Sequence, residues 1–149
     1  KFQSFIEAEG LTGDQIYNCD ETGLNYKMLP TKSLAAKTES AAPGYKRSKE
    51  RVTILACSNA TSNHRMELTM IGKAKNPRAF KGISKHTLPV KYCNQRSAWM
   101  SSDIFKDWFF KDFVPSAEKF LKENNLPREA VLLLDNAPTH PDESELKDG

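Results

Sequence analysis

Two aspartates, Asp20 and Asp135, stand where an apolar run of sequence gives way to a polar turn. The residues before each are typical of a β-strand, so each carboxylate is expected at the end of a strand. If the two strands are parallel neighbours, both carboxylates emerge at the edge where open α/β sheets bind their ligands. Adjacent carboxylates repel unless a cation lies between them, and their oxygens suit Mg²⁺ or Mn²⁺. A pair of such ions about 3.5–4 Å apart can cleave a phosphodiester bond.

The same aspartates have a structural interpretation. Aspartate is common in turns and as a helix cap after a strand, and the separation of 115 residues (135 − 20) does not bring the two together. Glu21 points to the opposite side of the strand from Asp20, because side chains alternate, so we interpret it as structural, with a contact to metal or DNA as the alternative. Asn136 and His140 follow the second acid and either orient a metal-bound water or phosphate, or form a turn. The residues alone leave these alternatives open.

The elements that would position these residues follow from the apolar periodicity. It predicts strands over 15–20, 51–60 and 65–74, and helices over 2–9, from 101 or 102 to 113, and over 117–124. A last strand is predicted over 130–134. It is apolar without alternation, which is typical of a central strand covered on both faces. Residues 61–64 read as a hairpin loop in which His64 is solvated. Residues 25–50 and 75–98 are expected to be irregular, and Pro115 to break or kink its helix. The order of elements predicts an α/β domain with a mixed sheet and flanking helices.

Basic residues concentrate in the middle of the chain. Between Lys27 and Arg96 fifteen Lys and Arg residues face three acids, a balance of +12, whereas Asp103 to Gly149 holds six basic and eleven acidic residues, or −5. Such a basic stretch favours a polyanionic partner, because Lys and Arg contacts to phosphate release counterions. A solvated surface is the alternative. Two clusters are candidates for contacts to DNA or RNA phosphates: Lys46, Arg47, Lys49 and Arg51, and then Lys73, Lys75, Arg78 and Lys81.

The three cysteines, Cys19, Cys57 and Cys93, have no paired spacing. This pattern favours reduced thiols of the cytosol or nucleus over a disulfide framework or a zinc site. No apolar run approaches the roughly 20 residues that span a bilayer, so no membrane partner is expected. Nothing in the sequence fixes the oligomeric state.

Four segments resemble, in order, the DDE endonuclease domain of the Tigger and jerky transposases, which are pogo-like. They are QIYNCDETGLNYKMLP (15–30), YKRSKERVTILACSNATSNHRMELTMIGKAKNPRAF (45–80), AWMSSDIFKDWFFKDFVP (98–115) and VLLLDNAPTH (131–140). The similarity is close to continuous from about Phe5 to His140. Four motifs in the right order are more specific than any one of them.

The resemblance implies a ribonuclease H-like fold and DNA strand cleavage and transfer by three acids that hold a two-metal site of Mg²⁺ or Mn²⁺. Asp20 and Asp135 match the first two acids, as catalytic and metal-binding residues. The third acid is expected beyond Gly149, so residues 1–149 are interpreted as a partial catalytic domain, incomplete at its C-terminus and inactive alone. The acids of the tail lie in the wrong place for the third ligand; they are Asp142, Glu143, Glu145 and Asp148. A nuclear location is also implied.

Two other functions remain open. Some members of this family are domesticated nuclear proteins that bind DNA or RNA without catalysis. This alternative expects either that the third acid is replaced or that both aspartates are dispensable. A phosphotransferase of the haloacid-dehalogenase type is disfavoured, because its nucleophile motif has two acids separated by one residue. The segment Asp20-Glu21-Thr22 does not match that motif.

Overall fold

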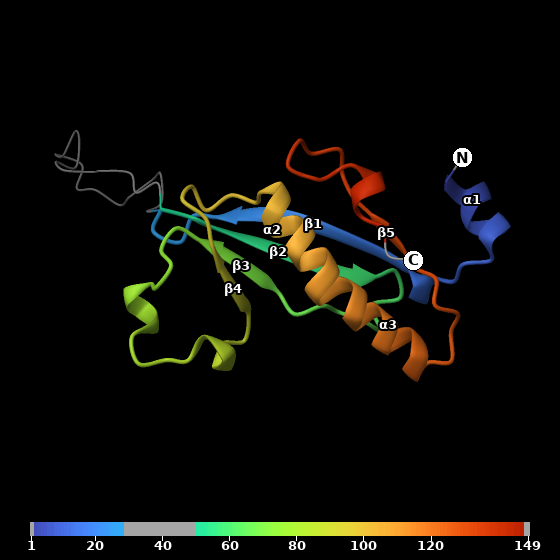
Figure 1. Cartoon of the computed structure of the whole chain (residues 1–149), viewed down its shortest axis with the longest axis horizontal. Helices are drawn as coiled ribbons and strands as arrows, with labels where there is room; N and C mark the ends of the chain where they lie inside the picture. The colour runs from blue at the N-terminus through green and yellow to red at the C-terminus, as the bar shows by residue number, and fades with distance from the viewer. Residues whose placement is uncertain (1, 29–49, 148–149) are drawn as a thin grey trace, which may run out of the picture.

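A computed structural model describes residues 2–28 and 50–147 of the chain (Figure 1). Its longer elements are α1 (Phe2–Glu9), β1 (Ile16–Leu24), β2 (Val52–Asn59), β3 (Thr69–Gly72), β4 (Lys91–Asn94), α2 (Ser102–Trp108), α3 (Val114–Glu123) and β5 (Val131–Leu133). Within these ranges no helix has the length and apolar character needed to cross a membrane. Three of the predicted nucleic-acid-binding residues, Lys46, Arg47 and Lys49, lie outside the described residues.

The strands form one five-stranded mixed sheet in the order β4-β3-β2-β1-β5. The central strand β2 is antiparallel to both β1 and β3. Each edge adds a parallel pair, β1 with β5 and β3 with β4. The predicted α/β architecture with a mixed sheet is therefore confirmed, and it is consistent with a ribonuclease H-like fold.

One face of the sheet is covered by the helical segment that includes α2 and α3, which lies across the strands in Figure 1. Alternation along β1 and β2 directs Tyr17, Cys19, Leu55 and Cys57 toward this segment, and all four are buried. Helical spacing places the buried apolar residues of the helices on one stripe; they are Phe105, Trp108, Phe109, Phe113, Ala117 and Leu121. The hydrophobic core thus lies between one sheet face and one helical segment.

Pro115 does not break the helix, which was the first of the two outcomes (a break or a kink) that the sequence predicted. The chain passes from α2 through a π-helical segment, Phe109–Phe113, directly into α3, which carries Pro115 in its first turn. Proline lacks an N–H and its ring collides with the carbonyl four residues earlier. The wider π turn just before it is a known way to absorb such a disruption without breaking the helix.

Several strand predictions were wrong at the edges of the sheet. β4 lies inside the stretch 75–98 that was expected to be irregular, and β5 is an edge strand with half-buried residues, not a central one. The predicted strand over 65–74 is reduced to β3, with an isolated bridge between Arg65 and Ser58. Short edge strands form because a neighbour offers hydrogen bonds, and their own side chains need not alternate.

Candidate active site

The two predicted acids are carried by parallel neighbours. β1 and β5 pair in the register Ile16↔Val131 to Asn18↔Leu133. Asp20 and Asp135 each stand two residues beyond this last pair, Asp20 within β1 and Asp135 just past β5. The two strands are therefore parallel neighbours, as the sequence required, and their register, continued by two residues, aligns the two acids.

Asp20 itself lies within β1 and not at its end. The strand continues to Leu24, because the antiparallel pairing with β2 extends through Asp20↔Ala56 to Leu24↔Val52, so the turn predicted directly after Asp20 is wrong. Asp20 is exposed, on the face opposite the buried Cys19. Its Oδ1 accepts a hydrogen bond of 2.8 Å from the backbone N–H of Glu21.

Asp135 lies just beyond β5, at the start of a tight turn. Its Oδ1 accepts a 3.3 Å hydrogen bond from the N–H of Ala137, and the N–H of His140 donates to the carbonyl of Ala137 at 3.0 Å. These bonds fold residues 135–140 back on themselves, as expected of an Asp-initiated turn. The turn returns the His140 ring to the acid that precedes it.

A close group of three side chains forms where this turn meets β1. The Nε2 atom of His140 lies 2.9 Å from Glu21 Oε1, and its Nδ1 atom lies 3.0 Å from Asp135 Oδ1. One potential ligand atom from each residue lies within 4.8 Å of the others. Asp20 is not a member of this group. Among the described residues, Glu21 is the β1 acid that contacts the turn.

The His140 side chain is nearly buried, and both of its ring nitrogens contact polar atoms. Its ring packs on Phe105 of α2, with the ring centroids 4.7 Å apart. Burial lowers the pKa of His140, but the hydrogen bonds to Glu21 and to the Asp135 backbone, together with both negative charges, outweigh burial and leave the pKa above its ordinary value. The site therefore favours a positive ring between two acids.

Two donor sets could hold a divalent cation. Asp20 and Asp135 are linked by strand register and are both exposed, so solvent and a ligand reach them. The group of Glu21, Asp135 and His140 is linked by proximity. Carboxylate oxygens in either set fit a hard cation, whereas the imidazole of the second set suits a softer one.

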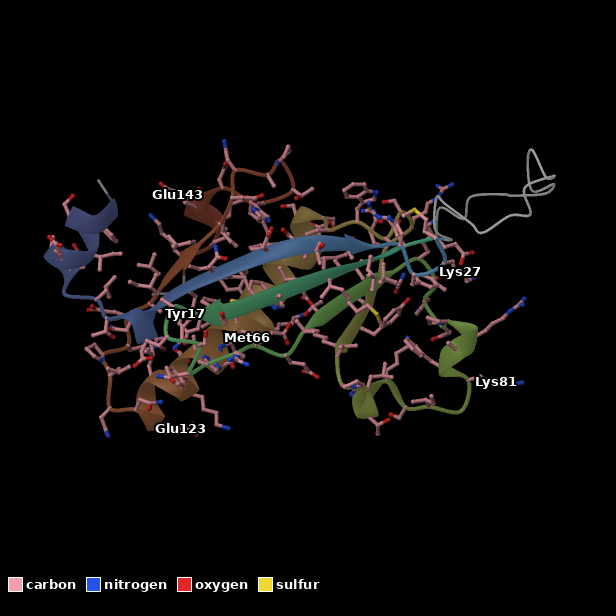
Figure 2. The ribbon with its side chains drawn as sticks, turned by 180° about the vertical axis from the view of Figure 1, so that it is seen from behind. Tyr17, Lys27, Met66, Lys81, Glu123 and Glu143 are labelled. Carbon is pink, nitrogen blue, oxygen red and sulfur yellow. The ribbon has the colours of Figure 1, made fainter. Side chains whose placement is uncertain are left out.

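The described basic residues divide into two kinds. Lys73, Lys75, Arg78 and Lys81 are exposed on the connection between β3 and β4. Arg51 instead lies with its guanidinium carbon 3.4 Å from the centroid of the Trp99 ring. Figure 2 shows Lys27 and Lys81 at the same end of the molecule, far from Tyr17. Whether any of these residues binds nucleic acid stays a prediction.

From the sequence, Glu21 was expected to be structural and the segment around His140 to form a turn. Alternation correctly placed Glu21 on the other side of β1 from Asp20. What it could not supply was a partner on that side, since His140 is 119 residues away. The short spacing from Asp135 to His140 was the one available signal.

The mixed sheet, the helices on one of its faces and the acids on its parallel pair define an α/β domain of the ribonuclease H-like type. Residues 49–149 match a family model described as DDE superfamily endonuclease, and this is more than half of the chain. The chain therefore belongs to the DDE superfamily endonucleases, in the Tigger/jerky family. Endonucleases of this superfamily usually use a divalent metal ion, and their substrate is DNA.

The chain is similar over nearly its whole length to curated Jerky and Tigger proteins. It is 46% identical to Jerky protein homolog of Homo sapiens over 147 residues, which are 97% of this chain and 26% of that protein. Identity is 42% over 147 residues with Jerky protein of Mus musculus, again 97% of this chain and 26% of the relative. The chain is 36% identical over 150 residues to Tigger transposable element-derived protein 7 of Homo sapiens, and these residues are 98% of this chain and 27% of the relative. The chain thus spans about a quarter of the length of these relatives. No solved structure is significantly similar to it.

Proposed function

We propose that Asp20 and Asp135 are catalytic residues that hold Mg²⁺ or Mn²⁺ in a DNA-cleaving centre of the transposase type. The observation that supports this is the parallel register of β1 and β5, which, continued by two residues past Asn18↔Leu133, aligns Asp20 on β1 with Asp135 just beyond β5. Both side chains are exposed, so a cation and a phosphate can approach them. When bound, the cation would supply Lewis-acid stabilisation of charge on the phosphate oxygens.

The proposal extends to the parts around this centre. Residues 1–149 are proposed to be part of a larger catalytic domain whose third acid lies outside them, and alone they would be inactive as a nuclease. Lys73, Lys75, Arg78 and Lys81 would contact DNA phosphates without reading bases, because phosphate contacts position the duplex and carry no direct sequence information. A protein that cleaves and joins DNA would act in the nucleus.

The test is plasmid nicking by the full-length protein with Mg²⁺ or Mn²⁺. Asp20→Asn and Asp135→Asn keep the shape of each side chain but remove its charge. Each should lower the nicking rate by at least about 100-fold, because loss of a ligand should cost no less than the largest losses seen when a residue that hydrogen-bonds to a ligand is changed. Glu67→Gln, at an exposed residue distant in sequence from both acids, is the matched control and should nick as the wild type does. Nicking that survives both aspartate variants would contradict the proposal.

A second function is favoured by the exposed lysines, which need no metal to bind a polyanion. In this alternative the protein is a domesticated, non-catalytic DNA- or RNA-binding protein. The same experiment distinguishes the two. Full binding to nucleic acid without metal-dependent nicking, unchanged in both aspartate variants, would favour the non-catalytic function.

A further inference from the structure

His140 links two segments that the sequence keeps 119 residues apart. Its Nε2 lies 2.9 Å from Glu21 Oε1 on β1, and its Nδ1 lies 3.0 Å from both the carbonyl oxygen and Oδ1 of Asp135. The His140 side chain is 5% exposed and that of Glu21 14%, against 64% for Asp135. The ring and Glu21 are therefore enclosed by protein, while the carboxylate that the ring contacts faces solvent.

These contacts leave neither ring nitrogen free for a metal ion. A metal–nitrogen bond of about 2.0–2.1 Å, as in zinc sites, uses the in-plane direction in which each nitrogen already meets an oxygen. The tilted contact with the Phe105 ring, with 4.7 Å between centroids and 44° between planes, also restrains the ring. Coordination by His140 would break one of the existing hydrogen bonds. The three side chains thus form a hydrogen-bonded group that is complete without an ion.

The same contacts distinguish the two oxygens of Asp135. Oδ1 faces His140 Nδ1 at 3.0 Å and also accepts the 3.3 Å hydrogen bond from Ala137. Within residues 2–28 and 50–147, no hydrogen bond or ion pair to Oδ2 is found. Oδ2 is therefore the oxygen that remains for a cation. Its direction is set by the contacts of Oδ1 with His140 and Ala137.

Glu21 connects this arrangement to the other acid. It is the residue next to Asp20 on β1, and its side chain lies on the opposite face of the sheet. A bond from Glu21 to His140 and from His140 to Asp135 therefore fixes the turn after β5 against β1 at the level of Asp20. We propose that Glu21 and His140 are positioning residues that hold the Asp135 carboxylate in place relative to Asp20, and are not metal ligands.

This inference rests on the proposed function, in which Asp20 and Asp135 bind the cation. Residues that hydrogen-bond to metal ligands typically contribute about 10–100-fold to metal affinity or activity. Binding of Mn²⁺ to the full-length protein, followed by electron paramagnetic resonance, measures this directly. His140→Ala and Glu21→Ala should each weaken Mn²⁺ binding by about 10–100-fold, while Glu21→Gln, which keeps an oxygen acceptor, should remain near the wild type.

Matched controls are His86→Ala and Glu67→Ala, both at exposed residues, which should bind Mn²⁺ as the wild type does. Wild-type affinity in both His140→Ala and Glu21→Ala would overturn the proposal. Pulsed electron paramagnetic resonance of bound Mn²⁺ tests directly whether His140 is a ligand. Because His140 is proposed only to position Asp135, no coupling between Mn²⁺ and a His140 nitrogen is expected. A nitrogen coupling that disappears in His140→Ala would make His140 a ligand and would also overturn the proposal.

A readout without metal separates this inference from the proposed function. In metal-free protein labelled with ¹⁵N-histidine, the ring resonances of His140 should shift in Glu21→Ala and in Asp135→Asn, but not in Glu67→Ala. If the wild type binds no Mn²⁺, the proposed function fails, and these resonances still decide whether the hydrogen-bonded group exists. If the His140 ring resonances are unchanged in both Glu21→Ala and Asp135→Asn, the positioning role is wrong.

Discussion

His64 lies in the turn between β2 and β3 and is tied to the core through both ring nitrogens. Nδ1 lies 2.8 Å from the Tyr17 hydroxyl and Nε2 lies 3.0 Å from Ser116 Oγ. The ring also stacks on Phe120, with 4.7 Å between centroids and 6° between planes. The expectation of a solvated His64 is therefore wrong, because α3 packs over the turn. Burial lowers the pKa of His64, with Glu123 acting in the opposite direction, and burial raises the pKa of Tyr17 to about 12.

This lowered pKa predicts a pH dependence of stability. The unfolded chain takes up the His64 proton more readily than the folded one, so this contribution is complete above pH about 6.5 and is lost as the pH falls below that value. His64→Gln removes the titration, so its free energy of unfolding should decline less than that of the wild type between about pH 6.5 and pH 5. Urea unfolding at several pH values measures the difference.

The control for this prediction is His86→Gln, at an exposed residue, which should retain the wild-type decline. His140 titrates in all three proteins and cancels from the comparison. A decline in His64→Gln equal to that of the wild type would show that His64 does not change its pKa on folding.

At the residue scale, the sequence could predict the acids but not their contacts. Asp20, Glu21 and Asp135 are recognisable from strand-like sequence followed by polar residues, and the period of two separates Asp20 from Glu21. It does not say which face of β1 meets the turn after β5. That depends on Phe105 of α2, which packs against the His140 ring and which no local pattern connects to it.

At the scale of elements, the helical segment from Ser102 to Glu123 stabilises the covered face of the sheet. Phe105 is fully buried and contacts both Trp108 and His140. Phe105→Ala should lower the free energy of unfolding by about 3–5 kcal/mol, because it removes a large buried ring and leaves a cavity. Phe110, 42% exposed on the same segment, is the control, and Phe110→Ala should cost about 1 kcal/mol or less.

Fluorescence of Trp108, which is 2% exposed, follows the unfolding of this face in denaturant. Equal losses in the two variants would mean that the helical segment is not packed on the sheet as described. A further loss of His140 ring order in Phe105→Ala alone would agree with the contact between these two rings.

The elements differ in how far the sequence could predict them. β1 and β2 were predictable because eight-residue pairing on one buried face enforces alternation, seen in Thr53, Leu55 and Cys57. β4 and β5 have four and three residues, and their parallel partners are distant in sequence. Such strands are specified largely by the neighbour that they join. The local pattern therefore missed β4, and it predicted β5 as a strand over 130–134 but not its place at the edge of the sheet. The π segment before Pro115 was missed for a similar reason, since proline alone does not say how a helix will accommodate it.

At the scale of the whole molecule, charge is unevenly distributed along the long axis. The exposed lysines of the β3–β4 connection gather at one end, marked by Lys81 in Figure 2, while Glu123 and Glu143 lie toward the other. Between β3 and β4 the chain carries no acidic residue. An excess of positive charge attracts a polyanion at long range, and the attraction weakens as salt screens it.

The exposed lysines of the β3–β4 connection predict how DNA binding depends on salt concentration. Each lysine that neutralises a phosphate contributes about 0.9 to the slope of log affinity against log salt concentration. The triple variant Lys73→Gln, Lys75→Gln and Lys81→Gln should therefore lower the slope of the full-length protein on duplex DNA by up to about 3, equally for unrelated sequences. Filter binding or fluorescence anisotropy across a salt series measures the slope.

A matched triple, Lys111→Gln, Lys119→Gln and Lys122→Gln, removes the same charge from exposed residues of the helical segment and should leave the slope near that of the wild type. The comparison separates local contact from net charge, because both variants lose three positive charges. Equal slopes in the two triples would show that DNA does not bind the β3–β4 connection. A smaller slope in the first triple alone would place the phosphate backbone at this end of the sheet, whether or not the protein cleaves DNA.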